Sequence, residues 1–293
     1  MSDIKLENLE INGYHIYQDK DSFNFGIDAV LLANFALREG GTGARITRPY
    51  DEGSQASPLR VGADMLSARG TTECRPLQIC DFCAGALPIP LIMYAKRKMF
   101  LGDIVKFTAF EIDKDQAELC NKSIDYNKTN VEDAKNIDDD MEVINDDIKN
   151  IFNERDKYKS LYETFDIITC NPPYTKKGSG VINLNDKKLV ARHEIFITFE
   201  EICKAASLLL KSNKKFYIVH HSERLTELSE ILKSNSFEIK KIQFVYPKLE
   251  KPSTLCLIEA VKNARAGVKI LEPIIVFEND GSYTKNIDKI YGK

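Results

Sequence analysis

Residues 165–174 read FDIITCNPPY, and the interpretation of the whole chain starts from this stretch. Phe165–Cys170 is apolar at its centre, which is typical of a strand buried on both faces of a parallel sheet. The following Asn171-Pro172-Pro173-Tyr174 breaks the strand, because Asn-Pro and Pro-Pro begin loops. The sequence therefore predicts a buried strand that ends in a polar and aromatic turn. Taken alone, that turn need be no more than the end of a strand.

Short apolar strands and helices alternate on both sides of this stretch. The predicted strands are Leu77–Cys80, Lys106–Phe110, Met141–Ile144 and Lys215–His220, and the predicted helices are Ile27–Leu37, Ile89–Lys98, Lys114–Asn127, Phe199–Leu210 and Glu223–Lys233. Such alternation predicts an α/β protein with a mostly parallel, doubly wound sheet. The last two long strands, Ile239–Tyr246 and Leu255–Val261, are joined by a short connection and should pair antiparallel.

Four polar residues fall where predicted strands end, namely Asp81, Glu111, Asp147 and Asn171. In doubly wound sheets, ligands lie beyond the carboxyl ends of the strands. Glu111 could accept hydrogen bonds from both hydroxyls of a ribose, and Asp147 from an adenine amino group. Asp81 and Gly85 lie in the first strand-to-helix turn, where a cofactor must approach the backbone closely. The plainer alternative is that the acids are ordinary surface residues.

The Asn171–Tyr174 turn suits the chemistry of an aromatic amine, whose lone pair is delocalised into its ring. The side-chain carbonyl of Asn171 and the backbone carbonyl of Pro172 can each accept one N–H of such an amine. Two acceptors would favour a pyramidal nitrogen and direct its lone pair at an electrophilic methyl group. Pro172 and Pro173 fix the direction of the backbone carbonyls, since the proline ring fixes φ. Tyr174 offers a ring on which a base can stack.

Arg192-His193-Glu194 separates this turn from the next predicted helix. It is either a cluster at the start of that helix or part of a loop that closes over a substrate. In the second case, Arg192 would contact a phosphate, and both Arg192 and His193 are candidate substrate-binding residues. His220-His221 ends a buried strand and is expected to be a structural pair.

Residues 38–76 differ in kind from the rest of what we predict to be a single domain, 1–293. They hold six of the eleven arginines and no lysine, and they show no helix or strand periodicity. We expect a flexible insertion within the domain.

Composition excludes several classes of protein. The chain of 293 residues has no apolar run long enough to cross a membrane, and Met1–Ile11 lacks the layout of a signal peptide. Seven scattered cysteines favour reduced thiols in the cytoplasm, and Cys80-x-x-Cys83 has no second pair with which to bind a metal. The net charge is -3, yet lysines dominate residues 204–251. They form either a solvated face or a phosphate-binding surface.

Together, these motifs resemble a known family, the bacterial methyltransferases that make N6-methyladenine at position 37 of a valine tRNA. The shared segments are FNFGIDAVLLANFA, DFCAG, FEID, FDIITCNPPY, ARHE, FYIVHHSERL and LCLIEAVKNARAGVKILEPIIVFENDGSYT. The resemblance implies a Rossmann-like class I methyltransferase sheet, S-adenosylmethionine as the methyl donor, and a tRNA substrate. It aligns Asp81, Gly85, Glu111 and Asp147 with donor-binding positions, and 171–174 with the target-amine site.

The chain departs from the family's pattern at Ala86 and Leu87, where relatives usually have Asn or Ser and then Gly. A side chain at position 87 could crowd the donor, so a catalytically impaired RNA-binding homologue remains an alternative. Two further alternatives share the amine chemistry: a methyltransferase for glutamine N5 in proteins and one for guanine N2 in rRNA. A short N-terminal part and the AVLLA segment count against the protein substrate.

Overall fold

The computed structural model describes residues 4–19, 25–40, 75–102, 104–173 and 197–293. Within these residues, nine strands form one sheet and two more form a separate hairpin. The sheet strands are β3 (Leu77–Phe82), β4 (Val105–Glu111), β5 (Met141–Asn145), β6 (Phe165–Cys170), β7 (Leu210–His221), β8 (Phe237–Tyr246), β9 (Leu255–Lys262), β10 (Lys269–Ile270) and β11 (Ile274–Ile275).

The order of strands in the sheet is β10-β8-β9-β7-β6-β3-β4-β5, with β11 also paired to β8. Strands β3 to β7 pair in parallel, whereas β9 is antiparallel to both of its neighbours, β7 and β8. After β3 the chain adds β4 and β5 on one side and then returns to place β6 on the other side. The winding therefore reverses between β3 and β6, and the carboxyl ends of these strands border the place where such sheets bind ligands.

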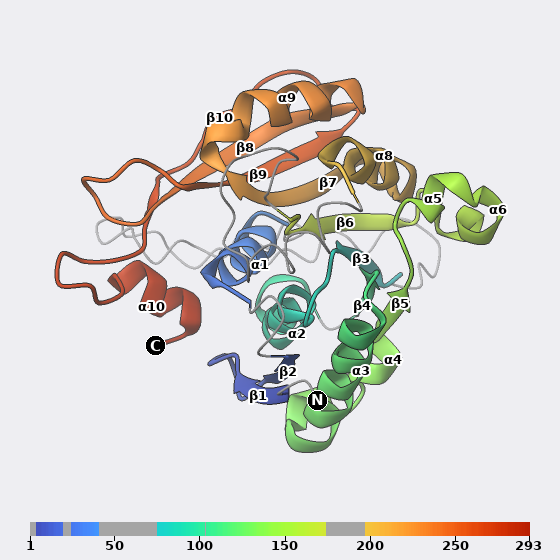
Figure 1. Ribbon diagram of the computed structural model, residues 1–293, viewed down its shortest axis with the longest axis horizontal. Helices are drawn as coiled ribbons and strands as arrows, with labels where there is room; N and C mark the ends of the chain where they lie inside the picture. The colour runs from blue at the N-terminus through green and yellow to red at the C-terminus, as the bar shows by residue number, and fades with distance from the viewer. Residues whose placement is uncertain (1–3, 20–24, 41–74, 103, 174–196) are drawn as a thin grey trace, which may run out of the picture.

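Helices cover both faces of the sheet (Figure 1). Apolar side chains of α1 (Ile27–Gly40), α2 (Pro88–Phe100) and α3 (Lys114–Asn130) belong to one buried cluster, which also includes residues of α10 (Lys285–Tyr291). A second cluster on the opposite face is formed with α5 (Asn150–Asn153), α8 (Phe199–Leu209) and α9 (Leu225–Ser234). Every residue of β6 is buried, as its apolar sequence predicts for a strand covered on both faces.

Local capping fixes where two of the helices begin. The Asp113 side chain accepts hydrogen bonds from the backbone N–H groups of Asp115 and Gln116 at the start of α3. At the start of α8, Thr198 and Glu201 form a reciprocal capping box. Because these caps satisfy N–H groups that have no partner inside the helix, each helix begins within a residue of the predicted position.

The predicted α/β architecture is confirmed, including the antiparallel closing pair β8 and β9. The strands and helices predicted from residue 77 onward are present, with ends that differ by a few residues; β7 differs most, beginning five residues earlier. After β9, two short strands, β10 and β11, join the sheet by pairing in parallel with β8. The sequence analysis did not identify the antiparallel hairpin of β1 (Ile4–Asn8) and β2 (His15–Asp19).

The hairpin packs against α3 through polar contacts between distant parts of the chain. The side chain of Asn127 accepts from the backbone N–H of His15 at 2.9 Å and donates to its carbonyl at 2.6 Å. The remaining small elements are η1 (Glu132–Ala134) and α4 (Ile137–Asp140) before β5, α6 (Arg155–Tyr158) and η2 (Lys159–Leu161) after it, and η3 (Ser222–Arg224) between β7 and α9.

The segment predicted as an insertion, residues 38–76, lies mostly outside the described residues. Its first residues complete α1, which ends at Gly40 rather than at the predicted Leu37. At its other end, the Arg75 guanidinium contacts the buried Asp166 carboxylate at 3.0 Å, next to the start of β3. The order of residues 41–74 stays a prediction.

Candidate active site

The register between β3 and β6 brings the first predicted donor-binding residue beside the predicted amine-binding turn. Asp81 is paired with Thr169, and Phe82 with Cys170, in the parallel ladder. Asn171 directly follows Cys170, so it leaves the sheet next to the loop that follows Phe82. This is the point where the winding of the sheet reverses.

Asp81 is almost completely buried, with 2% of its surface exposed. The Thr169 hydroxyl donates to Asp81 Oδ1 at 2.5 Å, whereas Asp81 Oδ2 is a buried oxygen with no hydrogen-bond partner among the residues that the structure describes. Burial raises the pKa of Asp81 to about 8, against the lowering effect of the Thr169 hydrogen bond, and the nearby Glu111 raises it further. An unpartnered buried oxygen is costly, so it marks a place where a polar ligand group fits.

The loop after β3 adopts left-handed backbone conformations at alternate residues. Cys83, Gly85 and Leu87 have φ values of 59°, 53° and 70°. A Cβ placed on Gly85 would have no atom within 4 Å, so the loop offers open space at that position. This space is compatible with a ligand that lies close to the backbone.

Leu87 keeps the backbone conformation that glycine normally supplies. Its N–H donates to the Ala84 carbonyl at 2.8 Å, and its fully buried side chain belongs to the same cluster as the apolar residues of α1 and α2. A left-handed leucine costs about 1–2 kcal/mol, which burial of the side chain, at about 1.5–3 kcal/mol, can offset. Burial of the Leu87 side chain can therefore offset the strain of its left-handed backbone.

Glu111 ends β4 and is 4% exposed. Its Oε2 accepts from the Gly85 N–H at 2.7 Å, and its Oε1 accepts from the Asp113 N–H at 2.9 Å. Burial raises the pKa of Glu111, while these backbone hydrogen bonds lower it. Each carboxylate oxygen has a second lone pair, so both can still accept from the hydroxyls of a ribose.

Asp147 lies just beyond β5, the outermost strand on this side of the sheet. Its Oδ1 accepts from the Lys149 N–H at 2.9 Å, and its Oδ2 lies 3.2 Å from Lys149 Nζ. The residue is half-buried. Asp81 and Glu111 thus lie at the carboxyl ends of β3 and β4, and Asp147 lies just beyond β5; the three strands are neighbours in the sheet.

Asn171 is held by a residue that the sequence analysis did not select. Its Nδ2 donates to Asp28 Oδ2 at 3.1 Å, although 143 positions separate the two residues. Asp28 lies in the first turn of α1, where an acid suits the helix dipole, so its place in the sequence gave no sign of a role at the site. No local spacing could reveal this contact, because it depends on how α1 packs over the sheet.

The two prolines that follow Asn171 lie just beyond the carboxyl end of β6; Pro172 is buried and Pro173 is half-buried. Tyr174, Arg192 and His193 lie outside the described residues, so their predicted roles remain predictions.

His220, which the sequence predicts to be structural, is buried in β7, and its Nδ1 accepts from the His221 N–H at 2.8 Å. Burial and the neighbouring Arg224 lower the pKa of His220 to about 3, which keeps the imidazole neutral.

Several lysines in the 204–251 segment pair with acids of the same chain. Lys211 and Lys214 lie 2.8 and 3.2 Å from the buried Asp166 carboxylate, near the start of β6. Lys215 and Lys241 contact the buried Glu259 at 3.5 and 3.2 Å. Asp166 and Lys211 lie near the starts of β6 and β7, whereas Asn171 follows the far end of β6. These pairs therefore do not form a phosphate-binding surface around the candidate site.

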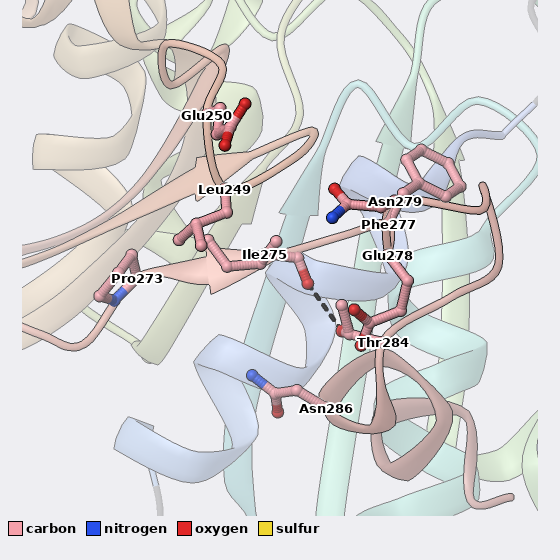
Figure 2. A pocket seen from close by; sticks show the side chains of 9 residues that line it. All are labelled: Leu249, Glu250, Pro273, Ile275, Phe277, Glu278, Asn279, Thr284 and Asn286. Carbon is pink, nitrogen blue, oxygen red and sulfur yellow. Dashed lines mark hydrogen bonds between the residues drawn. The ribbon is translucent and has the colours of Figure 1, made fainter.

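A separate hollow of about 340 Å³ is formed by the connection after β8 and the C-terminal tail. Figure 2 shows Leu249 and Ile275 on one side of it and Phe277 and Asn279 on the other; the Thr284 hydroxyl donates to the Ile275 carbonyl at 2.7 Å. The hollow contains none of the predicted site residues and no buried acid. We therefore place the chemistry at the strand ends rather than here.

Two negative findings hold for the part of the chain that the structure describes. No helix there is both long enough and apolar enough to cross a membrane. We also find no group of three or more histidine, cysteine, aspartate or glutamate side chains in those ranges that could hold a metal ion.

Comparison with curated proteins confirms the family resemblance that the motifs indicated. A tRNA1(Val) (adenine(37)-N6)-methyltransferase of Shewanella sediminis is 28% identical over 128 residues, covering 42% of this chain and 52% of the relative. One of the same name from Dyadobacter fermentans is 26% identical over 118 residues, covering 40% and 48%. The chain thus matches about half the length of these curated relatives. No protein-family model matches it.

Comparison with solved structures identifies the fold. A predicted O-methyltransferase from Agrobacterium tumefaciens superimposes with a TM-score of 0.56 at 20% identity, covering 75% of this chain and 91% of the other. This chain has a class I methyltransferase fold, in agreement with the order and directions of its strands.

We predict that the raised pKa of Asp81 makes stability fall as pH rises. The folded-state pKa of about 8 exceeds the ordinary value of 3.8, so the folded chain keeps a proton that the unfolded chain releases. Between about pH 4 and pH 8, this group lowers the unfolding free energy by up to about 1.4 kcal/mol per pH unit. Chemical denaturation across this range should show the slope in the wild type and a flatter dependence in Asp81→Asn.

Asp115→Asn is the matched control, because Asp115 is exposed at the start of α3. It should keep the wild-type pH dependence. The same slope in wild type and Asp81→Asn would contradict the assignment of a protonated, buried carboxyl group.

Proposed function

We propose that this protein transfers a methyl group from S-adenosylmethionine to N6 of adenine in a tRNA, at position 37 of tRNA1(Val). The observation that carries the proposal is the position of Asn171 and Pro172 directly beyond β6, beside the Asp81–Leu87 loop at the reversal of the sheet. The names of the curated relatives support the same reaction. A tRNA substrate implies a cytoplasmic protein.

The residues along the strand ends fit the donor group by group. Asp81 Oδ2 lacks a partner, and the space beside Gly85 is open. Glu111 retains a free lone pair on each oxygen for the ribose hydroxyls, and Asp147 is available to the adenine amino group. When bound, S-adenosylmethionine supplies an electrophilic methyl group on a sulfonium ion.

On the substrate side, the chain positions the target amine and does not need a strong base. Asn171 Oδ1 and the Pro172 carbonyl each accept one N–H of the adenine N6 amine, which directs the nitrogen lone pair toward the methyl carbon. Pro172 has no N–H that could compete, and its fixed φ holds the carbonyl direction. Transfer of the methyl group would break its bond to the donor sulfur, leave S-adenosylhomocysteine and give a positively charged nitrogen; Asn171 Oδ1 and the Pro172 carbonyl would stabilise that charge until a proton passes to water.

The shape of the Leu87 loop supports donor binding over the impaired, RNA-binding alternative. The side chain at position 87 is fully buried and does not extend into solvent beside Gly85. The backbone at positions 83, 85 and 87 is left-handed, which supports close approach of a ligand to this loop.

We predict that Asn171→Ala separates donor binding from catalysis. Affinity for S-adenosylmethionine, measured by isothermal titration, should stay within about threefold of wild type, because Asn171 contacts the amine and not the donor. Turnover should fall by about 10² to 10³, the usual loss when one transition-state hydrogen-bond partner is removed.

Asn263→Ala is the control, since Asn263 is exposed and contacts Ser212 at 3.2 Å, away from the strand ends. It should change neither quantity. Equal losses of affinity and turnover in Asn171→Ala would mean that the residue is structural. A folded wild-type protein that gives no heat with S-adenosylmethionine would instead support the RNA-binding alternative.

A second prediction concerns the substrate. Nucleoside mass spectrometry of total tRNA from cells with and without the gene should show N6-methyladenosine lost from one valine isoacceptor. Loss of glutamine methylation in release factors, with the tRNA unchanged, would contradict the assignment. Loss of N2-methylguanosine from rRNA would contradict it equally.

A further inference from the structure

We propose that Asp28 is a positioning residue for the reaction, which holds the amide of Asn171 so that its oxygen is presented to the target amine. The inference rests on the proposed function, because it assigns Asn171 to amine binding. It adds a residue from α1 that no predicted site included. The contact that carries it is the hydrogen bond from Asn171 Nδ2 to Asp28 Oδ2 at 3.1 Å.

An ionised carboxylate can only accept hydrogen bonds, so it selects one of the two orientations of an asparagine amide. With Nδ2 facing Asp28, Oδ1 must point to the other side of the amide group. If the amide rotated by half a turn, its NH2 group would meet the N–H groups of the amine, and two donors would face each other. The acid therefore prevents the orientation in which Asn171 could not accept from the substrate.

The charge on Asp28 also strengthens the acceptor. A negative oxygen beside the amide N–H polarises the amide and increases the partial negative charge on Oδ1. Asp28 is 7% exposed, so little solvent screens this effect. An amide oxygen polarised in this way stabilises the positive charge that develops on the methylated nitrogen better than an isolated amide would.

The fold holds Asp28 in place by means that do not involve the substrate. Its Oδ1 accepts from the Ala29 N–H at 2.9 Å in the first turn of α1, and the following residues from Ala29 to Leu37 are buried. A Cβ on Gly26 would lie 2.6 Å from Asp28 Oδ1, so glycine leaves room for the carboxylate. Asp28 therefore reaches Asn171 from a packed helix, which suits a residue that positions another.

The test is a double-mutant cycle with total tRNA from cells that lack the gene as the methyl acceptor. We expect Asp28→Ala to lower kcat by about tenfold or more, with donor affinity by titration within about threefold of wild type. In an Asn171→Ala background, Asp28→Ala should cause no further loss, because the residue acts only through Asn171. Asp28→Asn, whose amide oxygen can still accept from Asn171, should recover part of the activity.

Asp115→Asn is the matched control, since it also removes an acid from the first turn of a helix but has no contact with Asn171. It should leave kcat unchanged. Thermal melting of each variant identifies losses that come from unfolding, and the isosteric Asp28→Asn supplies the comparison if Asp28→Ala does not fold.

Independent effects of the two substitutions, multiplying in the double variant, would overturn the proposal. A fall in donor affinity as large as the fall in kcat would overturn it as well, because Asp28 would then act on the donor. If Asn171→Ala itself leaves turnover unchanged, the proposed function fails. If Asn171→Ala is impaired but Asp28→Ala is not, only the role of Asp28 fails.

Discussion

The parallel pairing of β3 with β6 is the constraint on which the candidate site depends. It aligns Asp81 with Thr169 and Phe82 with Cys170, so the loop after one strand and the turn after the other leave the sheet side by side. Since the chain changes its direction of winding between these two strands, the helices that follow them diverge. A shift of one residue in this register would reverse which face of β6 each side chain occupies and would separate Asn171 from the donor loop.

Two acids at the carboxyl ends of β3 and β4, Asp81 and Glu111, are buried at a cost in stability, which agrees with the proposed donor site there. Asp81 has an unpartnered buried oxygen, and burial raises the pKa of both Asp81 and Glu111. Neither arrangement favours folding, because moving a carboxyl group from water into the interior is costly whether the group is ionised or keeps its proton. At the opposite ends of the strands, the negative charge of a buried acid is neutralised directly. Asp166, near the start of β6, contacts Arg75, Lys211 and Lys214. This contrast agrees with a ligand at the carboxyl ends of the parallel strands and none at their amino ends.

Much of the fold could be predicted because its signals are local. β6 is apolar at its centre, α3 and α8 carry side-chain caps, and the proline-containing link between β8 and β9 gave their antiparallel pairing. Likewise, the strand-end positions of Asp81, Glu111 and Asp147 followed from alternation alone. What sequence could not give was contact between distant segments. Asp28 meets Asn171 only because α1 packs over the sheet, and the β1–β2 hairpin is stabilised by Asn127 of α3. The sequence left two interpretations of the lysines after residue 204 open for the same reason, since Asp166 and Glu259, which pair with several of them, lie elsewhere in the sequence.

The most direct test of the account is a crystal structure of the protein with S-adenosylhomocysteine and an adenosine-containing anticodon stem-loop of the valine tRNA. The account predicts adenine N6 at hydrogen-bonding distance, about 3 Å, from both Asn171 Oδ1 and the Pro172 carbonyl, with the donor sulfur on the opposite side of the nitrogen. Adenine bound elsewhere, for example in the hollow beside Phe277, with Asn171 directed away from it, would contradict the account.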